Sequence, residues 1–173
     1  MLNQESSMIT IRSATPEDYR AIQEVAHQTW PVTFGEILSA PQIAYMLDRM
    51  YSLSALWEQV EERNHVFLLA EEEGSCLGYL SYELSYAGTA KTKIHKIYVL
   101  PATQGKGVGK HLLSQAEQIA RDNGNNVLTL NVNRYNKAVQ FYQKLGFAII
   151  GSEDIDIGNG FLMEDYILEK TLL

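Results

Sequence analysis

Val99–His111 reads VLPATQGKGVGKH, and three glycines, Gly105, Gly107 and Gly109, stand at every second position between a β-rich apolar run and an amphipathic one. Because glycine has no Cβ atom, the backbone here can turn tightly and let a ligand approach its N–H groups. The helix predicted to follow adds unpaired N–H donors and the positive end of its dipole. The segment therefore predicts a site for a phosphate or pyrophosphate, with a glycine turn that binds no ligand as the alternative.

Two common nucleotide-binding loops do not fit this segment. A Walker A loop ending at Gly109-Lys110 would need glycine where Gln104 stands, and serine or threonine where His111 stands. A dinucleotide fingerprint starting at Gly105 would need its third glycine at Lys110. The pattern that does fit is Gln/Arg-x-x-Gly-x-Gly/Ala, starting at Gln104.

The N-terminal part of the chain predicts a helix followed by an aromatic connection. The helix begins at Pro16 and should end near Trp30, because Pro31 disfavours helical backbone in the residue before it. Residues 29–35 then form an aromatic loop. In that loop Trp30 and Phe34 either close an edge of the core or form the mouth of a substrate site.

The other elements follow from hydrophobic periodicity and turn residues. They are a strand at 8–12, one bent or two short helices at 41–63, a hairpin of 65–70 with 76–86, a strand at 91–100, a helix at 107–122, a strand at 127–132, a helix at 136–145, and strands at 147–150 and 161–169. This order predicts an α+β fold in which helices flank a mixed sheet. No linker interrupts it, so residues 1–173 are expected to form a single domain.

Composition narrows the class of protein. The 173 residues carry 14 basic and 21 acidic side chains, a net charge of −7, which argues against a nucleic-acid binder and suits a cationic small molecule. No stretch is long and apolar enough to span a membrane, and the polar N-terminus does not resemble a signal peptide. The single cysteine, Cys76, suits the reducing cytoplasm.

The glycine segment resembles that of the GCN5-related N-acetyltransferases, the GNAT family. A second family segment, NKAVQFYQKLGF, lies at residues 136–147, one helix and one strand further along. The order of elements resembles the GNAT fold, with its mostly antiparallel sheet, over nearly the whole chain. Within the family, residues 29–36, 109–113 and 162–172 resemble PaiA-type polyamine N-acetyltransferases. The resemblance implies acetyl-CoA as co-substrate and no metal.

The resemblance also implies which residues hold acetyl-CoA. The strand before the turn would pair its main chain with the pantetheine arm, the turn would bind the pyrophosphate, and an asparagine and a tyrosine further on would complete the site. These residues are Ile97, Tyr98, Val99, Gln104, Gly105, Lys106, Gly107, Val108, Gly109, Lys110, Asn136 and Tyr142. Asn136 could equally cap the following helix, and Asn131 and Asn133 are further, weaker candidates.

For catalysis, the resemblance makes Tyr142 the general acid that protonates the leaving thiolate. The family's usual glutamate base falls on Lys93 in this chain, so the base is open between Glu83, His95 and bulk water. Alternation places Lys93 and His95 on one face of their strand. The other histidines, at 27, 65 and 111, show no metal-ligand spacing and are expected in surface or core roles.

We therefore expect direct transfer of an acetyl group to a primary amine of a small cationic acceptor, with a polyamine as one candidate. Acidic groups such as Glu36, Asp48 or Glu83 would attract that acceptor. A homodimer is expected because the family often forms one. The alternatives are a protein N-terminal acetyltransferase and a GNAT-fold module that binds acyl-CoA without catalysis.

Overall fold

The computed structural model describes residues 8–103 and 105–172. The elements are β1 (Thr10–Ser13), α1 (Tyr19–Phe34), α2 (Ala40–Tyr51), α3 (Leu53–Glu61), β2 (Val66–Glu72), β3 (Ser75–Glu83), β4 (Lys91–Val99), α4 (Val108–Asp122), β5 (Val127–Asn133), α5 (Ala138–Lys144), β6 (Ala148–Gly158) and β7 (Phe161–Thr171). Short 3-10 turns lie at Pro16–Asp18, Tyr86–Gly88 and Pro101–Thr103. The predicted order of helices and strands is confirmed.

All seven strands form one sheet in the order β1-β2-β3-β4-β5-β7-β6. Within residues 8–103 and 105–172, only β4 and β5 run parallel, and every other neighbouring pair is antiparallel. The predicted α+β class with a mostly antiparallel mixed sheet is therefore confirmed. Among the described residues, no helix is long and apolar enough to cross a membrane.

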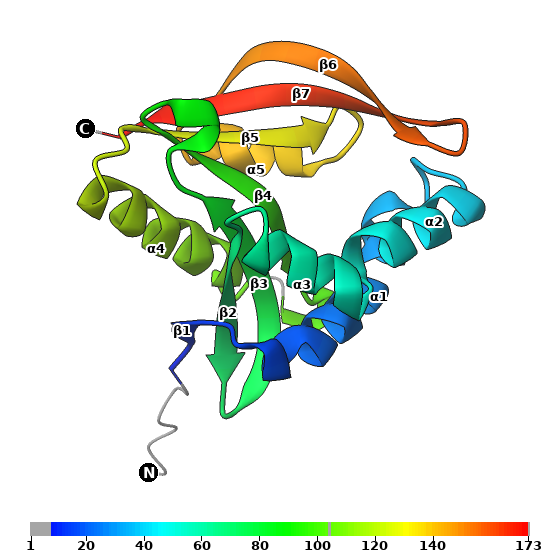
Figure 1. Ribbon diagram of the computed structural model, residues 1–173, viewed down its shortest axis with the longest axis horizontal. Coiled ribbons are helices and arrows are strands. Elements are labelled where there is room, and N and C mark those ends of the chain that lie inside the picture. The colour runs from blue at the N-terminus through cyan, green and yellow to red at the C-terminus, as the bar shows by residue number, and fades with distance from the viewer. Residues whose placement is uncertain (1–7, 104, 173) are drawn as a thin grey trace.

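Helices cover both faces of the sheet (Figure 1). Side chains alternate along each strand, so Leu68 joins the core under α4 and α5, while Phe67 and Leu69 join the core under α1, α2 and α3. The β6–β7 hairpin extends past the rest of the sheet toward α2. Two hydrogen bonds tie α2 to it, from Gln42 Nε2 to the carbonyl of Leu162 and from Tyr45 Oη to the carbonyl of Ile157, both 2.9 Å long.

The predicted helix end near Trp30 is wrong. Helix α1 continues through Pro31 to Phe34, so the predicted aromatic loop is helical. Pro31 removes one helical N–H, but Trp30 and Phe34 are only 1% and 3% exposed, and burying such rings offsets that loss. The two aromatics close the core, and their rings pack on each other and on Tyr98. Because the segment is helical and both rings are buried, it does not form the mouth of a substrate site.

The closing strands are also longer than predicted. β6 runs to Gly158 rather than Ile150, and β7 runs to Thr171 rather than Glu169. Acidic residues such as Glu153 and Asp156 have low strand propensity, so the local sequence pattern does not predict the outer half of β6. Its pairing with β7 supplies the hydrogen bonds that the sequence pattern does not reveal.

Candidate active site

The parallel strands β4 and β5 separate part-way along the sheet. They pair only from Lys91 opposite Val127 to Ile94 opposite Leu130. Beyond that point β4 keeps β3 as its neighbour, and β5 keeps β7. Residues 95–99 of β4 thus have an open edge, whose free N–H and C=O groups can pair with an extended chain that carries amides. This edge contains the three strand residues predicted for donor binding.

A bulge in β4 lies where the open edge begins. Ser81 pairs with Lys96 and Tyr82 pairs with Ile94, so His95 has no partner of its own on β3. A bulge bends its strand and increases the local twist. The bulge coincides with the point at which β4 separates from β5.

The glycine segment forms the turn that the sequence predicts. Gly105 and Gly107 have φ values of +91° and +74°, which disfavour any residue with a Cβ atom. Gly107 is the N-cap of α4, and the N–H of His111 donates to its carbonyl at 3.0 Å. The N–H groups of residues 108–110 precede this bond and are free to bind an anion at the positive end of the helix. Gln104 lies outside the described residues.

Gly109 brings the turn, β4 and α5 together. A Cβ atom built on Gly109 would lie 3.5 Å from Phe141 Cζ and 3.8 Å from Val99 Cγ2. Any larger side chain would therefore fill the space beside the open strand edge. The free N–H groups and this narrow space fit an anion followed by an extended arm, as in coenzyme A. Lys106 and Lys110 are exposed, and Lys106 forms a 3.3 Å ion pair with Glu72.

Helix α5 carries the predicted general acid. Tyr142 is 6% exposed, and its ring lies between those of Phe141 and Phe147. Burial raises the pKa of its phenol above the usual value, which keeps the hydroxyl protonated. Asn136 Oδ1 accepts a 2.9 Å hydrogen bond from the N–H of Ala138, the first residue of α5, but the N-cap position of this helix is occupied by Lys137. The contact of Asn136 with the donor stays a prediction.

The two base candidates, Glu83 and His95, form a hydrogen-bonded pair. His95 Nε2 lies 2.9 Å from Glu83 Oε1, and His65 Nε2 lies 3.7 Å from the same oxygen. The pKa of His95 is lowered to about 3 by burial and by the charges of Lys96 and Lys93. Burial, His95 and Lys96 lower the pKa of His65 to about 3 as well. Both imidazoles are therefore neutral near pH 7, and neither binds protons readily.

His65 was missed as a member of this site. In the structure Val66 pairs with Tyr82, and a bulge at Ala70/Glu71 shifts the register so that His65 approaches Glu83, whereas the predicted turn at 71–75 would bring residue 65 opposite residue 81. The imidazole rings of His65 and His95 stack with centroids 3.8 Å apart and planes within 15°. Since imidazole lone pairs lie in the ring plane, two parallel rings do not converge on one metal ion. The arrangement favours hydrogen bonding over metal coordination.

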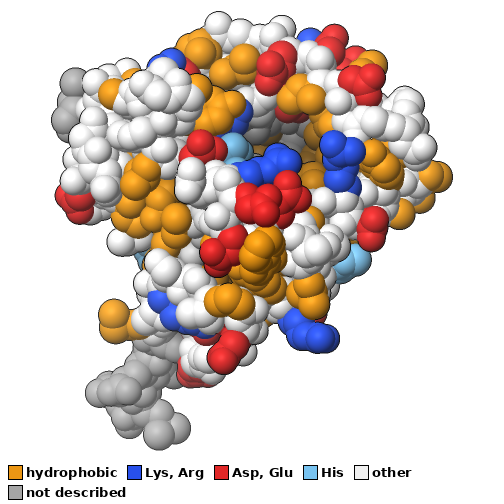
Figure 2. All heavy atoms as spheres, viewed as in Figure 1, with side chains coloured by type: hydrophobic (Ala, Val, Ile, Leu, Met, Phe, Trp, Pro, Cys, Tyr) orange, Lys and Arg blue, Asp and Glu red, His pale blue; other side chains and the backbone are white. Residues whose placement is uncertain are grey.

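Lys93 occupies the neighbouring position on the same face. Glu83 pairs with Lys93 across β3 and β4, so both side chains project from one face of the sheet. Lys93 Nζ lies 3.3 Å from Asn131 Oδ1 and 4.9 Å from the centre of the Tyr86 ring. This face looks into a hollow between the β6–β7 hairpin and helices α2 and α3, with basic, acidic and histidine side chains at its rim (Figure 2).

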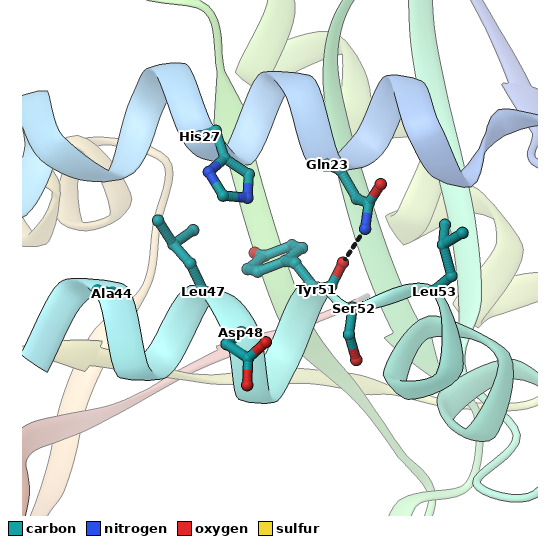
Figure 3. A pocket seen from close by; sticks show the side chains of 8 residues that line it. All are labelled: Gln23, His27, Ala44, Leu47, Asp48, Tyr51, Ser52 and Leu53. Atoms are coloured by element: carbon teal, nitrogen blue, oxygen red, sulfur yellow. Dashed lines mark hydrogen bonds between the residues drawn. The ribbon is translucent and has the colours of Figure 1, made fainter.

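Of the two other acidic candidates, Asp48 lies on α2 and Glu36 lies in the turn after α1. Asp48 lines a shallow groove between α1 and α2, together with His27 and Gln23 (Figure 3). Gln23 Nε2 closes the back of this groove through a 2.7 Å hydrogen bond to the carbonyl of Tyr51. Glu36 is exposed just beyond α1. Neither carboxylate shares the sheet face that carries Glu83.

Comparison with known proteins identifies the family. Residues 21–147 match the family model described as the acetyltransferase (GNAT) family. The chain belongs to the GNAT family of acetyltransferases. The spermidine N(1)-acetyltransferase of Thermoplasma acidophilum is 30% identical to this GNAT protein over 161 residues, which cover 90% of this chain and 96% of the relative.

Solved structures agree with this assignment. The crystal structure of the Thermoplasma acidophilum PaiA N-acetyltransferase in complex with coenzyme A superposes with a TM-score of 0.80, at 30% identity, and covers 95% of this chain and 99% of that one. The L-amino acid N-acyltransferase MnaT of Escherichia coli is 39% identical over 85 residues, covering 47% of this chain and 49% of that protein. The predicted GNAT membership and the likeness to the PaiA type are confirmed.

Proposed function

We propose that this GNAT acetyltransferase transfers the acetyl group of acetyl-CoA to a primary amine of a small cationic acceptor, with polyamines as the favoured class. The observation that carries the proposal is the open edge of β4 at residues 95–99, which leads directly into the glycine turn. A relative named as a spermidine acetyltransferase, similar along nearly the whole chain, supports the choice of acceptor.

The donor would be held mainly by backbone groups. Main-chain N–H and C=O groups of Ile97, Tyr98 and Val99 would pair with the amides of the pantetheine arm. The N–H groups of residues 105 and 107–110 would receive the pyrophosphate, since that of Lys106 already donates to the carbonyl of Thr103 at 3.2 Å, and the side chains of Lys106 and Lys110 would add charge. Acetyl-CoA itself supplies an acetyl thioester, which an unprotonated amine can attack.

The catalytic groups would move two protons. Glu83 would accept a proton from the incoming ammonium group, while neutral His95 holds the carboxylate through their 2.9 Å hydrogen bond. The protonated phenol of Tyr142 would donate to the departing thiolate. His95 is thus proposed as a positioning residue, because its pKa of about 3 leaves it a weak proton acceptor.

An acceptor screen tests the proposal. Release of free CoA is followed with spermidine, 1,4-diaminobutane, amino acids, aminoglycosides and short peptides at saturating acetyl-CoA. We expect turnover with the polyamines and much slower turnover with the peptides. Turnover confined to peptides would instead indicate an N-terminal acetyltransferase. Binding of acetyl-CoA without turnover of any amine would indicate a non-catalytic module.

Domain organisation and assembly complete the proposal. One sheet joins the first strand to the last two, which supports a single domain over residues 1–173. A homodimer, a cytoplasmic location and the lack of nucleic-acid or membrane partners stay predictions. Light scattering coupled to size-exclusion chromatography measures the oligomeric state, with twice the 19.5 kDa chain mass expected.

A further inference from the structure

Asp165 of β7 is a buried carboxylate with too few partners. The residue is 6% exposed. Its Oδ2 receives a long hydrogen bond of 3.4 Å from Asn131 Nδ2, and its buried Oδ1 has no partner among the described residues. Leaving a carboxylate oxygen buried and unpaired is costly, and such groups in native proteins call for a water, an ion or a ligand.

The strand register places Asp165 on the face of the proposed acceptor site. Asp165 pairs with Asn133 of β5, and paired residues project from the same face. Asn131, two residues before Asn133, projects from the same face and contacts Lys93 of β4. Lys93 in turn pairs with Glu83 of β3, so Glu83 lies on this face as well. Glu83 and Asp165 thus stand at opposite sides of one surface, on strands separated by β4 and β5.

Asp165 also lies beside the gap between the separated strands. Burial raises the pKa of Tyr98 on the open edge, and the nearby Tyr51, Tyr142 and Asp165 raise it further. The carboxyl group of Asp165 is therefore within electrostatic reach of Tyr98 on the open edge. Burial raises the pKa of Asp165 itself, with Glu153 adding to the shift and Asn131 opposing it.

The surroundings of Asp165 leave it without a cation of its own. Arg134 is held by Asp154 and lies 3.8 Å from Glu164, while Glu153 bonds to Asn131 at 2.7 Å. Lys93 directs its ammonium to Asn131 Oδ1 rather than to the carboxylate. Lys93 and Arg134 lower the pKa of Asp165 through their charges, but among the described residues neither forms an ion pair with its carboxylate. Since Lys93 lies between Asp165 and Glu83, this face suits an acceptor whose two positive charges are separated by an uncharged chain.

We propose that Asp165 binds a second ammonium group of a diamine or polyamine, while the amine at the other end of the same molecule is acetylated. An ammonium group bound here would give Oδ1 the charge-assisted hydrogen bond that it lacks. The inference rests on the proposed transfer to an amine and adds that the acceptor carries two charges. It makes Asp165 a specificity-determining residue of the acceptor site.

The test compares two acceptors that differ only in the second amine. 1,8-Diaminooctane has the length of spermidine, and n-octylamine lacks its second ammonium group. With the wild-type chain we expect kcat/KM to be at least tenfold higher for the diamine. Asp165→Asn should raise KM for the diamine about tenfold or more, because a hydrogen bond to a charged group is lost. It should leave n-octylamine within about twofold.

A matched control removes a charge of the same sign nearby. Glu164→Gln alters a side chain that is 45% exposed, and both acceptors should keep their wild-type constants. Asp165→Glu should keep part of the preference for the diamine, and thermal melts establish that each variant is folded. If Asp165→Asn does not fold, Asp165→Ser replaces it in the same comparison.

Separate results would refute the inference and the proposed function. The inference is wrong if Asp165→Asn lowers turnover of both amines equally, or changes neither. It is also wrong if the wild-type chain does not prefer the diamine. The proposed function is wrong if the wild-type chain binds acetyl-CoA but acetylates neither amine nor any polyamine.

Discussion

Replacing Lys96 of β4 by methionine should stabilise the protein at neutral pH. The Lys96 side chain is 6% exposed and lies over the rings of Tyr51 and Phe67, with Nζ 5.9 Å and 5.7 Å from their centres. Its hydrogen bond to Gln59 Oε1 is 2.7 Å long. Burial, with the charge of Arg63, lowers the pKa of Lys96 from 10.5 to about 7. The folded chain therefore opposes protonation of this amine.

The size of the effect follows from linkage. One pKa unit corresponds to about 1.36 kcal/mol, so at pH 7 the shift costs roughly 4 kcal/mol of folding free energy. In Lys96→Met, Gln59 Oε1 loses its donor and the two ring contacts lose their charge, which costs roughly 2 kcal/mol. The expected net gain in the free energy of unfolding at pH 7 is about 2 kcal/mol.

The two pKa values of Lys96 also set how stability depends on pH. The unfolded chain holds the proton of Lys96 up to about pH 10.5, while the folded chain releases it above about pH 7. Wild-type stability from this group therefore rises with pH above 7 and is lost as pH falls back to 7, by about 2 kcal/mol between pH 9 and pH 7. Lys96→Met should lack this rise.

Urea unfolding at pH 7 and pH 9 measures both effects. The difference between wild type and Lys96→Met isolates the one lysine from other titrating groups. Lys144→Met, at an exposed lysine of α5, should keep the wild-type dependence on pH. The reasoning would be refuted by a Lys96→Met variant that is less stable than wild type at pH 7 and whose free energy of unfolding changes with pH as that of wild type does. Burial would then not lower the pKa of Lys96.

Three further predictions follow from single contacts. Tyr142→Phe should lower kcat about 10²-fold while leaving acetyl-CoA affinity and the melting temperature near wild type; unchanged turnover would remove this phenol from catalysis. Gly78→Ala should cost about 2 kcal/mol and lower Tm by roughly 4–8 °C in a thermal melt, because its Cβ would lie 2.7 Å from the carbonyl oxygen of Tyr98; a Tm within a degree of wild type would contradict this close approach. Stability should fall as pH drops from about 6.5 toward 3, where the pKa of His95 lies, because the unfolded chain protonates this imidazole first. His95→Asn should show a shallower fall in acid unfolding curves, and an identical fall would show that His95 is not held neutral.

Local patterns predicted much of this fold. The glycine turn and the amphipathic helix after it are encoded within a few residues, and both lie where the sequence places them. The helix through Pro31 escaped prediction because burial of Trp30 and Phe34, far from their partners in sequence, overrides the local preference of proline. The outer half of β6 escaped for a similar reason, since its strand character depends on pairing with β7.

The residues of the site likewise fall into those that local sequence motifs predict and those that they do not. The donor residues lie in two contiguous motifs, which is why the sequence could nominate them. His65, Lys96 and Asp165 matter through pairings across the sheet or through contacts with a helix, so they carry no local signal. The approach of His65 to Glu83 also depends on the bulge at Ala70/Glu71, which the predicted hairpin did not contain.

Hydrogen–deuterium exchange, measured with and without acetyl-CoA, tests the central claim that backbone groups of the open β4 edge and the glycine turn hold the donor. We expect slower amide exchange in peptides that cover residues 95–99 and 105–110 when acetyl-CoA is bound. We expect little change in the α1–α2 groove around Asp48. Protection of the groove, with unchanged exchange along β4 and the turn, would show that the donor is held elsewhere.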